Sequence, residues 1–261
     1  MQIYLDTETH SVNDPLIVQM GMIICETIPE EMGKVNLDAV NTIDELINPG
    51  VPIEYEAMAV HHITNEMVSQ SSAIGESLSR HLLDLHNYKG NYIIAHNAPF
   101  DVGAMKNSGL DISNYTIIDT LQCARHIWTD LSSYKLQYLR YAKGYYKQEM
   151  EFKEKHDVNN INTDLVHSAL PDAFYLWMLT EDMLLHHTFE ELAALSTTPI
   201  LLKDPPFGKY GAAKNNGKAI PFAEVARKDR RYLVWMLSAI DNDNVNLKYT
   251  IEYYLGKPGL N

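Results

Sequence analysis

The stretch Ile3-Tyr4-Leu5-Asp6-Thr7-Glu8-Thr9 is a short, largely apolar segment that carries two acidic side chains near its end. Its pattern predicts a β-strand, in which residues two apart project from the same face. Asp6 and Glu8 then point together, away from the face that carries Leu5. Two carboxylates on one face are unfavourable unless they are solvated or bind a cation. Taken alone, the pair is more typical of a solvated edge strand, so its meaning depends on the rest of the chain.

Another acidic residue follows a second predicted strand. The apolar run Tyr92-Ile93-Ile94-Ala95 predicts a buried strand, and His96-Asn97-Ala98-Pro99-Phe100-Asp101 comes directly after it. Ligands commonly bind in the crevice beyond the carboxyl ends of strands, which makes Asp101 a candidate ligand. The alternative is an acidic residue at the start of a helix, where the macrodipole favours negative charge.

The segment His167-Ser168-Ala169-Leu170-Pro171-Asp172-Ala173 predicts the start of a helix, because proline is favoured in a first helical turn. A continuous helix would separate His167 from Asp172 by roughly 140°. We therefore expect Asp172 in the first turn and His167 in the loop before it, where the histidine can fold back beside the carboxylate. Taken alone, His167 would be interpreted as an ordinary surface histidine.

Four carboxylates and one histidine in this order predict a hydrolytic site with two metal ions. Hard oxygen ligands suit Mg²⁺, with Mn²⁺ as a substitute, better than Zn²⁺. Two such ions roughly 4 Å apart would clamp the attacking and leaving oxygens of a phosphodiester. A histidine titrates near neutral pH and could take the proton from the attacking water. The predicted metal ligands are Asp6, Glu8, Asp101 and Asp172, and the predicted general base is His167.

The remaining pattern predicts an α/β domain, with a mixed β-sheet flanked by helices. Strands at residues 3–8, 17–26 and 42–47 are close enough in sequence to form a meander. Residues 144–164 are polar and predict an exposed or mobile connection, whereas residues 171–186 predict an amphipathic helix. Further helices are expected at residues 54–61, 72–86, 121–127 and 134–142 and after Pro99, with strands at 91–95 and 116–118.

The formal net charge of −13 is distributed unevenly. Residues 203–231 hold eight basic and three acidic residues, a net charge of +5, so the rest of the chain carries −18. This acidity weighs against a histone-like or sliding binder of duplex DNA, but it permits an enzyme that contacts a few phosphates. A proline-rich stretch precedes the basic segment. We therefore expect a catalytic domain at 1–195 that carries the acidic motifs, a linker at 196–206 and a small C-terminal module at 207–261 that is a candidate nucleic-acid-binding unit.

The composition also bears on the compartment. Cys25 and Cys123 are the only cysteines and are far apart, which favours a reducing environment. No apolar run reaches the roughly 18 residues of a membrane span, and no secretory signal is visible. We expect a cytoplasmic protein without membrane association. The sequence leaves the oligomeric state open.

The ordered motifs resemble the 3′→5′ exonucleases of the DnaQ-like superfamily, in the histidine-type class with an Asp-Glu-Asp-Asp ligand set. The tyrosine-type class has a tyrosine where this chain has Ser168. The resemblance covers most of the chain. Its motifs are Asp6-Thr7-Glu8-Thr9, Ala57-Met58-Ala59-Val60-His61-His62-Ile63-Thr64, Ala95-His96-Asn97-Ala98-Pro99-Phe100-Asp101, His167 with Asp172-Ala173, Phe207-Gly208-Lys209-Tyr210, Gly217-Lys218-Ala219-Ile220 and Tyr232-Leu233-Val234-Trp235.

This resemblance implies a ribonuclease H-like fold and the release of 5′-mononucleotides from the 3′ ends of DNA, single-stranded or duplex, a reaction used in DNA repair. It also implies that four residues lie near the terminal nucleotide: Thr7, Met58, His61 and Asn97. From local pattern alone, Met58 would be a core residue, His61 a helix-end residue and Asn97 a turn former. Residues 144–164 are longer than the family leads us to expect, and residues 211–216 interrupt the motifs of the C-terminal module.

Two other functions remain open at this stage. An exoribonuclease could use the same scaffold and the same ligands, and comparing DNA and RNA substrates would separate the two. A non-catalytic nucleic-acid-binding subunit is the other alternative, but a binding module has no need of four clustered acids.

Overall fold

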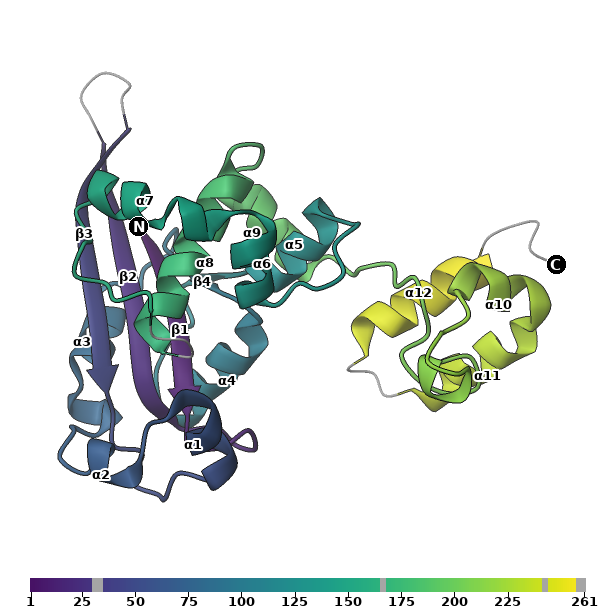
Figure 1. The fold of residues 1–261 in the computed structure, drawn as a ribbon, viewed down its shortest axis with the longest axis horizontal. Coiled ribbons are helices and arrows are strands. Elements are labelled where there is room, and N and C mark those ends of the chain that lie inside the picture. The colour runs from purple at the N-terminus through teal and green to yellow at the C-terminus, as the bar shows by residue number, and fades with distance from the viewer. Residues whose placement is uncertain (30–34, 165–167, 241–243, 257–261) are drawn as a thin grey trace. The chain divides into compact units, whose positions relative to one another are not determined.

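The computed structural model of the chain describes residues 1–29, 35–164, 168–240 and 244–256. The chain forms two compact units, Met1–Ser196 and Thr197–Asn261 (Figure 1). Among the helices of the described part, none is both long enough and apolar enough to cross a lipid bilayer.

The first unit is built around a five-stranded sheet with the strand order β3-β2-β1-β4-β5. Strands β1 (Gln2–Thr9), β2 (Ile17–Pro29) and β3 (Val35–Leu46) form the predicted antiparallel meander. Strands β4 (Tyr92–Ala95) and β5 (Thr116–Asp119) continue the sheet in parallel with β1. The predicted mixed sheet is thus confirmed, although β3 begins earlier than the sequence indicated.

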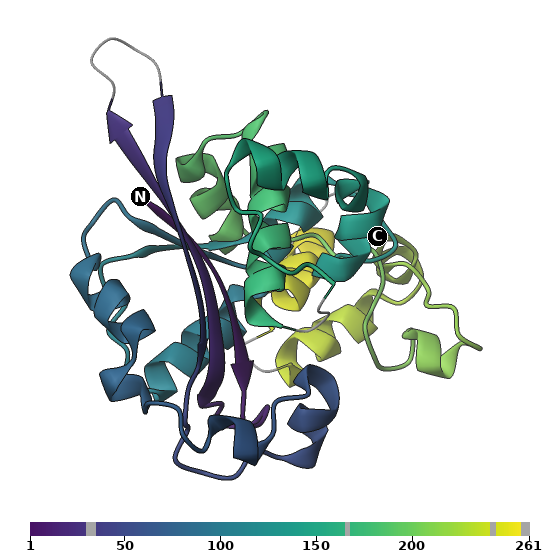
Figure 2. The ribbon, with the colours of Figure 1, turned by 60° about the vertical axis from the view of Figure 1, so that its left-hand side comes forward.

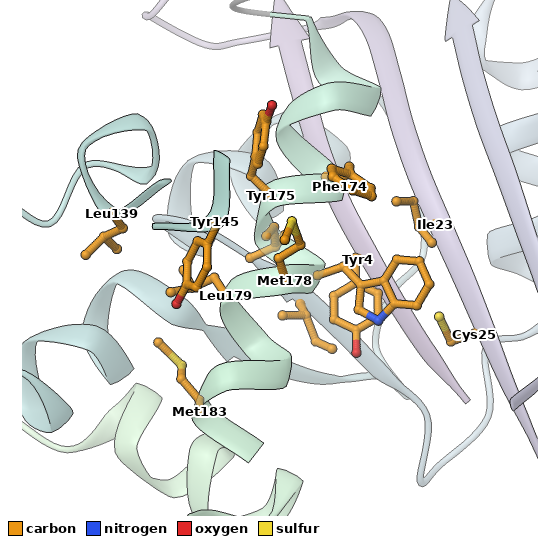
Figure 3. Packing of buried hydrophobic residues seen from close by; sticks show 14 of the residues in the cluster. Tyr4, Ile23, Cys25, Leu139, Tyr145, Phe174, Tyr175, Met178, Leu179 and Met183 are labelled. Atoms are coloured by element: carbon orange, nitrogen blue, oxygen red, sulfur yellow. The ribbon is translucent and has the colours of Figure 1, made fainter. Parts of the chain in front are cut away.

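Helices cover both faces of this sheet (Figure 2). On one face, Ile3 and Leu5 of β1 share a core with residues of α3 and α4. On the other, the ring of Tyr4 stacks on Trp177 of α8 with 5.9 Å between centroids, and Figure 3 shows Tyr4 among the side chains of that core. The helices of the unit are α1 (Tyr55–His61), α2 (Asn65–Val68), η1 (Ile74–Glu76), α3 (Leu78–Leu85), α4 (Ala98–Asn107), α5 (Thr120–Ile127), α6 (Leu136–Ala142), η2 (Tyr145–Lys147), α7 (Glu149–Lys155), α8 (Ala169–Leu184) and α9 (Phe189–Thr197).

The structure corrects the predictions for residues 144–164 and 171–186. The prediction of an exposed connection at residues 144–164 was wrong, because this segment forms η2 and α7 and buries Tyr145, Val158 and Ile161 in the core around α8. For the same reason α8 is not amphipathic: every residue from Ala169 to Thr180 is buried, since neighbouring elements cover it on several sides.

The helix predicted over residues 72–86 is also shorter than expected. The Oγ atom of Ser77 accepts a hydrogen bond from the backbone N–H of Arg80 at 3.0 Å and so caps α3, which starts at Leu78. A capping serine favours an extended backbone at its own position, so the preceding residues form the separate 3₁₀ turn η1.

The second unit has its own hydrophobic core. It contains η3 (Ala212–Lys214) and the three helices α10 (Phe222–Lys228), α11 (Arg230–Ala239) and α12 (Val245–Gly256). The buried side chains of this core are Phe222, Val225, Ala226, Leu233, Met236, Leu247 and Ile251.

Helix α8 rests directly on the backbone of strand β2. A Cβ atom added to Gly21 would lie only 2.2 Å from the carbonyl carbon of Ala169 and from the backbone nitrogen of Leu170. Gly21 is paired with Asp6 in the β1–β2 register. The missing side chain therefore lets the first turn of α8 come against the sheet beside Asp6. A glycine within a strand often marks such a close approach.

We predict that Gly21→Ala lowers both stability and activity. The added methyl group must push α8 away from β2, and overpacking of this kind costs about 1–3 kcal/mol. Denaturant unfolding measures the loss of stability, and a nuclease assay measures the loss of activity. The matched control is Gly103→Ala, because Gly103 lies in α4 with open space around its Cβ position. Equal stability and activity of the two variants would contradict the close contact.

Candidate active site

Three of the four predicted ligands meet at the end of strand β1. Asp6 and Glu8 project from the same face of β1, and Asp172 reaches them from the first turn of α8. One carboxylate oxygen from each of the three lies within 4.8 Å of the others. Asp172 is buried, whereas Asp6 and Glu8 are half-buried. This spacing allows a single cation to be coordinated by all three carboxylates.

Asp101 approaches the same strand from the opposite face of the sheet. It lies in the first turn of α4 and is buried, and its Oδ1 atom accepts hydrogen bonds from the backbone N–H of Thr7 at 3.0 Å and from the Thr7 hydroxyl at 2.7 Å. Thr7 lies between Asp6 and Glu8 in the chain. It was predicted to contact substrate, and the structure shows it fixing the Asp101 carboxylate.

Burial makes this group of acids electrostatically unfavourable. Desolvation raises the pKa of Asp6 well above its ordinary value, and the nearby carboxylates of Asp101, Asp172 and Glu8 raise it further. Burial, followed by the charges of Asp172 and Asp101, raises the pKa of Glu8 to about 8. Burial raises the pKa of Asp101 to about 7, although the hydrogen bonds from Thr7 oppose the shift. Oxygen ligands that resist ionisation without a counter-charge fit a hard divalent cation.

Gln137 of α6 holds the carboxylate of Asp172. Its Nε2 donates a hydrogen bond of 2.6 Å to Oδ1 of Asp172, and its Oε1 lies 3.5 Å from Nη1 of Arg140. Arg140 in turn forms an ion pair with Glu149 at 2.8 Å, at the start of α7. Glu149, in the segment at residues 144–164, thus helps to hold the carboxylate of Asp172 through Arg140 and Gln137. No motif in the sequence indicated Gln137 or Arg140.

Gln19 of β2 anchors the start of α8. Its Oε1 accepts a hydrogen bond of 3.3 Å from the backbone N–H of Ala169, and its Nε2 donates to Asp44 at 2.7 Å. Gln19 is paired with Glu8 in the strand register. The N–H groups of a first helical turn have no partner within the helix, so this contact fixes the helix that carries Asp172.

The other predicted substrate contacts surround the end of β1 and the start of α4. His61 is buried at the end of α1, with Nε2 3.1 Å from the carbonyl oxygen of Thr9 and Nδ1 accepting from the N–H of Ile63 at 3.0 Å. Met58 packs against a small cluster that includes Val18. Asn97 is exposed at the N-cap of α4 with a left-handed backbone (φ 70°).

The predicted general base, His167, lies outside the described residues. The structure resumes at Ser168, the N-cap residue of α8, and α8 begins at Ala169, close to the predicted start. Asp172 is therefore in the first turn, as the sequence indicated.

A mixed sheet with three carboxylates gathered at the end of β1 can hold a divalent cation. The sequence pattern of the family described as "Exonuclease" matches residues 3–179, which is more than half of the chain. The chain belongs to this family. The predicted membership in the DnaQ-like, histidine-type exonucleases is thereby confirmed, as is the predicted enzyme class, a 3′→5′ exonuclease.

Individual relatives agree with this assignment. Exodeoxyribonuclease 10 of Escherichia coli (strain K12) is 27% identical over 253 residues, which cover 96% of this chain and 97% of the relative. DNA polymerase III subunit epsilon of Pasteurella multocida (strain Pm70) is 35% identical over 49% of this chain and 51% of the relative. A solved structure of exonuclease X in complex with 5′ overhanging duplex DNA matches with a TM-score of 0.53 and 26% identity, over 75% of this chain and 99% of that chain. The ribonuclease H-like fold is as predicted.

We predict that the metal-free protein loses stability as the pH rises from about 5 to about 8. Glu8 and Asp101 have raised pKa values, so in this window the folded state binds more protons than the unfolded state. The free energy of unfolding must then fall with rising pH, by roughly 1.4 kcal/mol for each unit of pKa difference. Thermal unfolding in EDTA across this range tests the effect.

Glu8→Gln is the control for the pH experiment, because it removes one of the shifted groups and should flatten the dependence. Added Mg²⁺ or Mn²⁺ should restore stability more at pH 8 than at pH 5.5, since the ligands must be deprotonated to bind. Stability that rises with pH in EDTA would contradict the raised pKa values.

We predict that Gln137→Ala weakens metal binding without unfolding the protein. Loss of a group that orients a metal ligand typically costs 10- to 100-fold in metal affinity. The measurement is the shift of the melting temperature with Mn²⁺ concentration in the absence of DNA. Gln148→Ala is the matched control, because Gln148 is exposed and lies at the start of α7. An identical Mn²⁺ dependence for the two variants would show that Gln137 does not position Asp172.

Proposed function

We propose that this protein is a divalent-metal-dependent 3′→5′ exodeoxyribonuclease that releases 5′-mononucleotides from the 3′ ends of DNA. The observation that carries the proposal is the convergence of Asp6, Glu8 and Asp172, with Asp101 fixed beside them through Thr7. Support for DNA as the substrate comes from the relative named exodeoxyribonuclease 10, which aligns over nearly the whole chain. The DNA-bound neighbour gives further support.

The four carboxylates would hold two Mg²⁺ ions, which Mn²⁺ could replace. Asp6, Glu8 and Asp172 would together hold one ion, and Asp101, hydrogen-bonded to Thr7 between Asp6 and Glu8, would help to hold the second. When bound, the ions would supply a water of lowered pKa and stabilise charge on the phosphodiester oxygens. They would also offset the desolvation, and the smaller repulsion between carboxylates, that raise the pKa values of these acids.

Side chains of the protein would accept the proton, orient the carboxylates and contact the substrate. We propose that His167 accepts the proton from the attacking water. In the sequence it immediately precedes Ser168, the N-cap of the helix that bears Asp172. Thr7 keeps one oxygen of Asp101 occupied and so fixes the direction of the other. Met58, His61 and Asn97 would border the terminal nucleotide.

The biological setting is part of the same proposal. Removal of nucleotides from a 3′ end would serve DNA repair in the cytoplasm. The buried thiols of Cys25 and Cys123 form no disulfide in the part of the chain that the structure describes, which agrees with a reducing compartment.

The proposal is tested by digestion of end-labelled oligonucleotides with and without Mg²⁺. A 5′ label should produce a ladder that shortens from the 3′ end, and EDTA or Asp6→Asn should abolish it. Single-stranded, duplex and RNA oligonucleotides of one sequence define the substrate. Activity that persists in EDTA would refute the metal mechanism, and cleavage of RNA alone would make the enzyme an exoribonuclease.

We predict that His167→Ala lowers kcat by about 10²- to 10⁴-fold, the usual contribution of a general base. The loss should shrink at high pH, where hydroxide replaces the activated water, and the Mn²⁺-induced rise in melting temperature should be unchanged. His81→Ala is the control, because His81 is exposed on α3. Rates within twofold of the wild type at neutral pH would exclude His167 as the base.

A further inference from the structure

The second unit differs from the first in charge. Thr197–Asn261 contains ten basic and six acidic residues, a net charge of +4, whereas Met1–Ser196 carries −17. A positive unit attached to an acidic enzyme suggests a ligand that is itself an anion. Charge alone does not locate the surface, so the exposed apolar side chains have to be considered with it.

Helix α11 presents an exposed stripe made of Arg231, Val234 and Trp235, called here the α11 face. These residues are three and four apart and therefore lie on one side of the helix. Trp235 is 58% exposed and Val234 is 55% exposed. Leu233 and Met236, on the other side of the helix, are buried in the core of the unit. Exposed aromatic and arginine side chains are enriched at interaction surfaces, and here they lie one turn apart.

The aromatic part of this surface is held in place by the loop before it. The ring of Tyr232 contacts the ring of Trp235, with 5.4 Å between centroids, and the Tyr232 hydroxyl accepts a hydrogen bond of 2.9 Å from the N–H of Lys209. Gly208 has a φ of +80°, and a Cβ atom there would lie 2.1 Å from that hydroxyl. The backbone at Gly208 thus packs against Tyr232, whose ring contacts the indole of Trp235.

The acids near this surface are already paired. Asp229 accepts a hydrogen bond from Nζ of Lys209 at 2.8 Å, and Glu224 is paired with Lys228. Arg227 and Arg231 are exposed and have no ion pair among the described residues. Around the start of α11, the positive charges therefore remain available to an anionic ligand.

Helix α12 offers a useful comparison within the same unit. Its exposed side chains include Val245 and Tyr249, the latter 41% exposed. The exposed charges on this helix, Lys248 and Glu252, balance each other. Exposed apolar surface is therefore present on both helices, but only α11 combines it with unbalanced positive charge.

We infer that the α11 face binds single-stranded DNA, with an unpaired base stacked on Trp235 and a phosphate next to Arg231. The two side chains are four residues apart, about 6 Å along the helix axis, which matches the reach of one nucleotide. Stacking on an aromatic side chain requires an unpaired base, and a cationic neighbour grips the backbone without reading sequence. The inference rests on the proposed function in that it takes DNA as the ligand, and it adds a binding site separate from the carboxylates.

The test uses the full-length chain with Asp6→Asn in EDTA, so that binding is measured without cleavage. The probe is a fluorescently labelled oligothymidylate, followed by anisotropy. Trp235→Ala should weaken binding by at least about fivefold, the lower end of what one stacked base contributes. Trp235→Phe should recover most of this loss, and Tyr249→Ala, the matched control, should bind like the parent.

The salt dependence and a second substrate test the two halves of the site separately. Arg231→Gln should reduce the slope of log K against log salt by about 0.7, the value for one phosphate contact with a single strand. A blunt duplex should be insensitive to Trp235→Ala, because its bases are not free to stack.

Two results would overturn the inference. One is unchanged oligothymidylate binding by Trp235→Ala. The other is a change in oligomeric state with unchanged DNA affinity, which would make the α11 face a protein interface. Failure of the proposed function would be recognised separately, as a lack of metal-dependent cleavage of short oligonucleotides by the wild-type chain.

Discussion

The contact between the first turn of helix α8 and the backbone of strand β2 is the constraint on which the active site depends. Gly21 leaves no side chain between them, and the adjacent Gln19 on the same face holds the N–H of Ala169. One residue permits the approach, and the other fixes its direction. Because β1 is paired with β2 in register, this spacing also sets the distance from Asp172 to Asp6.

Two helices use the same arrangement to deliver an acid to the end of β1. Asp101 is the fourth residue of α4 and Asp172 is the fourth residue of α8, and the helices pack on opposite faces of the sheet. A helix N-terminus favours a carboxylate by about 0.3–1 kcal/mol. The pKa of Asp101 is nevertheless raised to about 7, a change that corresponds to several kcal/mol. Desolvation therefore outweighs the helix dipole, and the carboxyl either keeps its proton or requires a nearby cation to ionise.

The parts of the site that follow from local pattern could be predicted from the sequence. Strand alternation places Asp6 and Glu8 together, and a proline near a helix start places Asp172 in a first turn. The supporting residues could not be found in this way. Gln137 reaches Asp172 from a separate helix, 35 residues away in the chain. The role of Gly21 can be recognised only once helix α8 is known to pack against it. A glycine inside an apolar strand was nevertheless a usable signal of a close approach.

The wrong predictions about the fold have a related cause. Average polarity predicted an exposed segment at residues 144–164, yet its few apolar residues, Tyr145, Val158 and Ile161, are the ones that are buried. Composition averages over a segment, whereas packing depends on individual side chains. The same segment covers α8, so the core that supports Asp172 is completed by the region whose sequence looked least ordered. Its ion pair between Glu149 and Arg140 extends this support to Gln137.

The charge of the chain is divided between its two units in a way that suits the proposed function. Buried carboxylates that bind cations also repel the phosphates of a polyanionic substrate, and the first unit as a whole carries −17. Ions bound at the site act mainly within a Debye length of about 8 Å at physiological salt. Under the proposed function, nucleotides farther along a DNA strand would therefore be repelled by acidic charge that those ions do not offset. If the α11 face binds DNA as inferred, the positive second unit would supply the attraction that the metal site cannot, and catalysis and substrate binding would be carried by separate units of the chain.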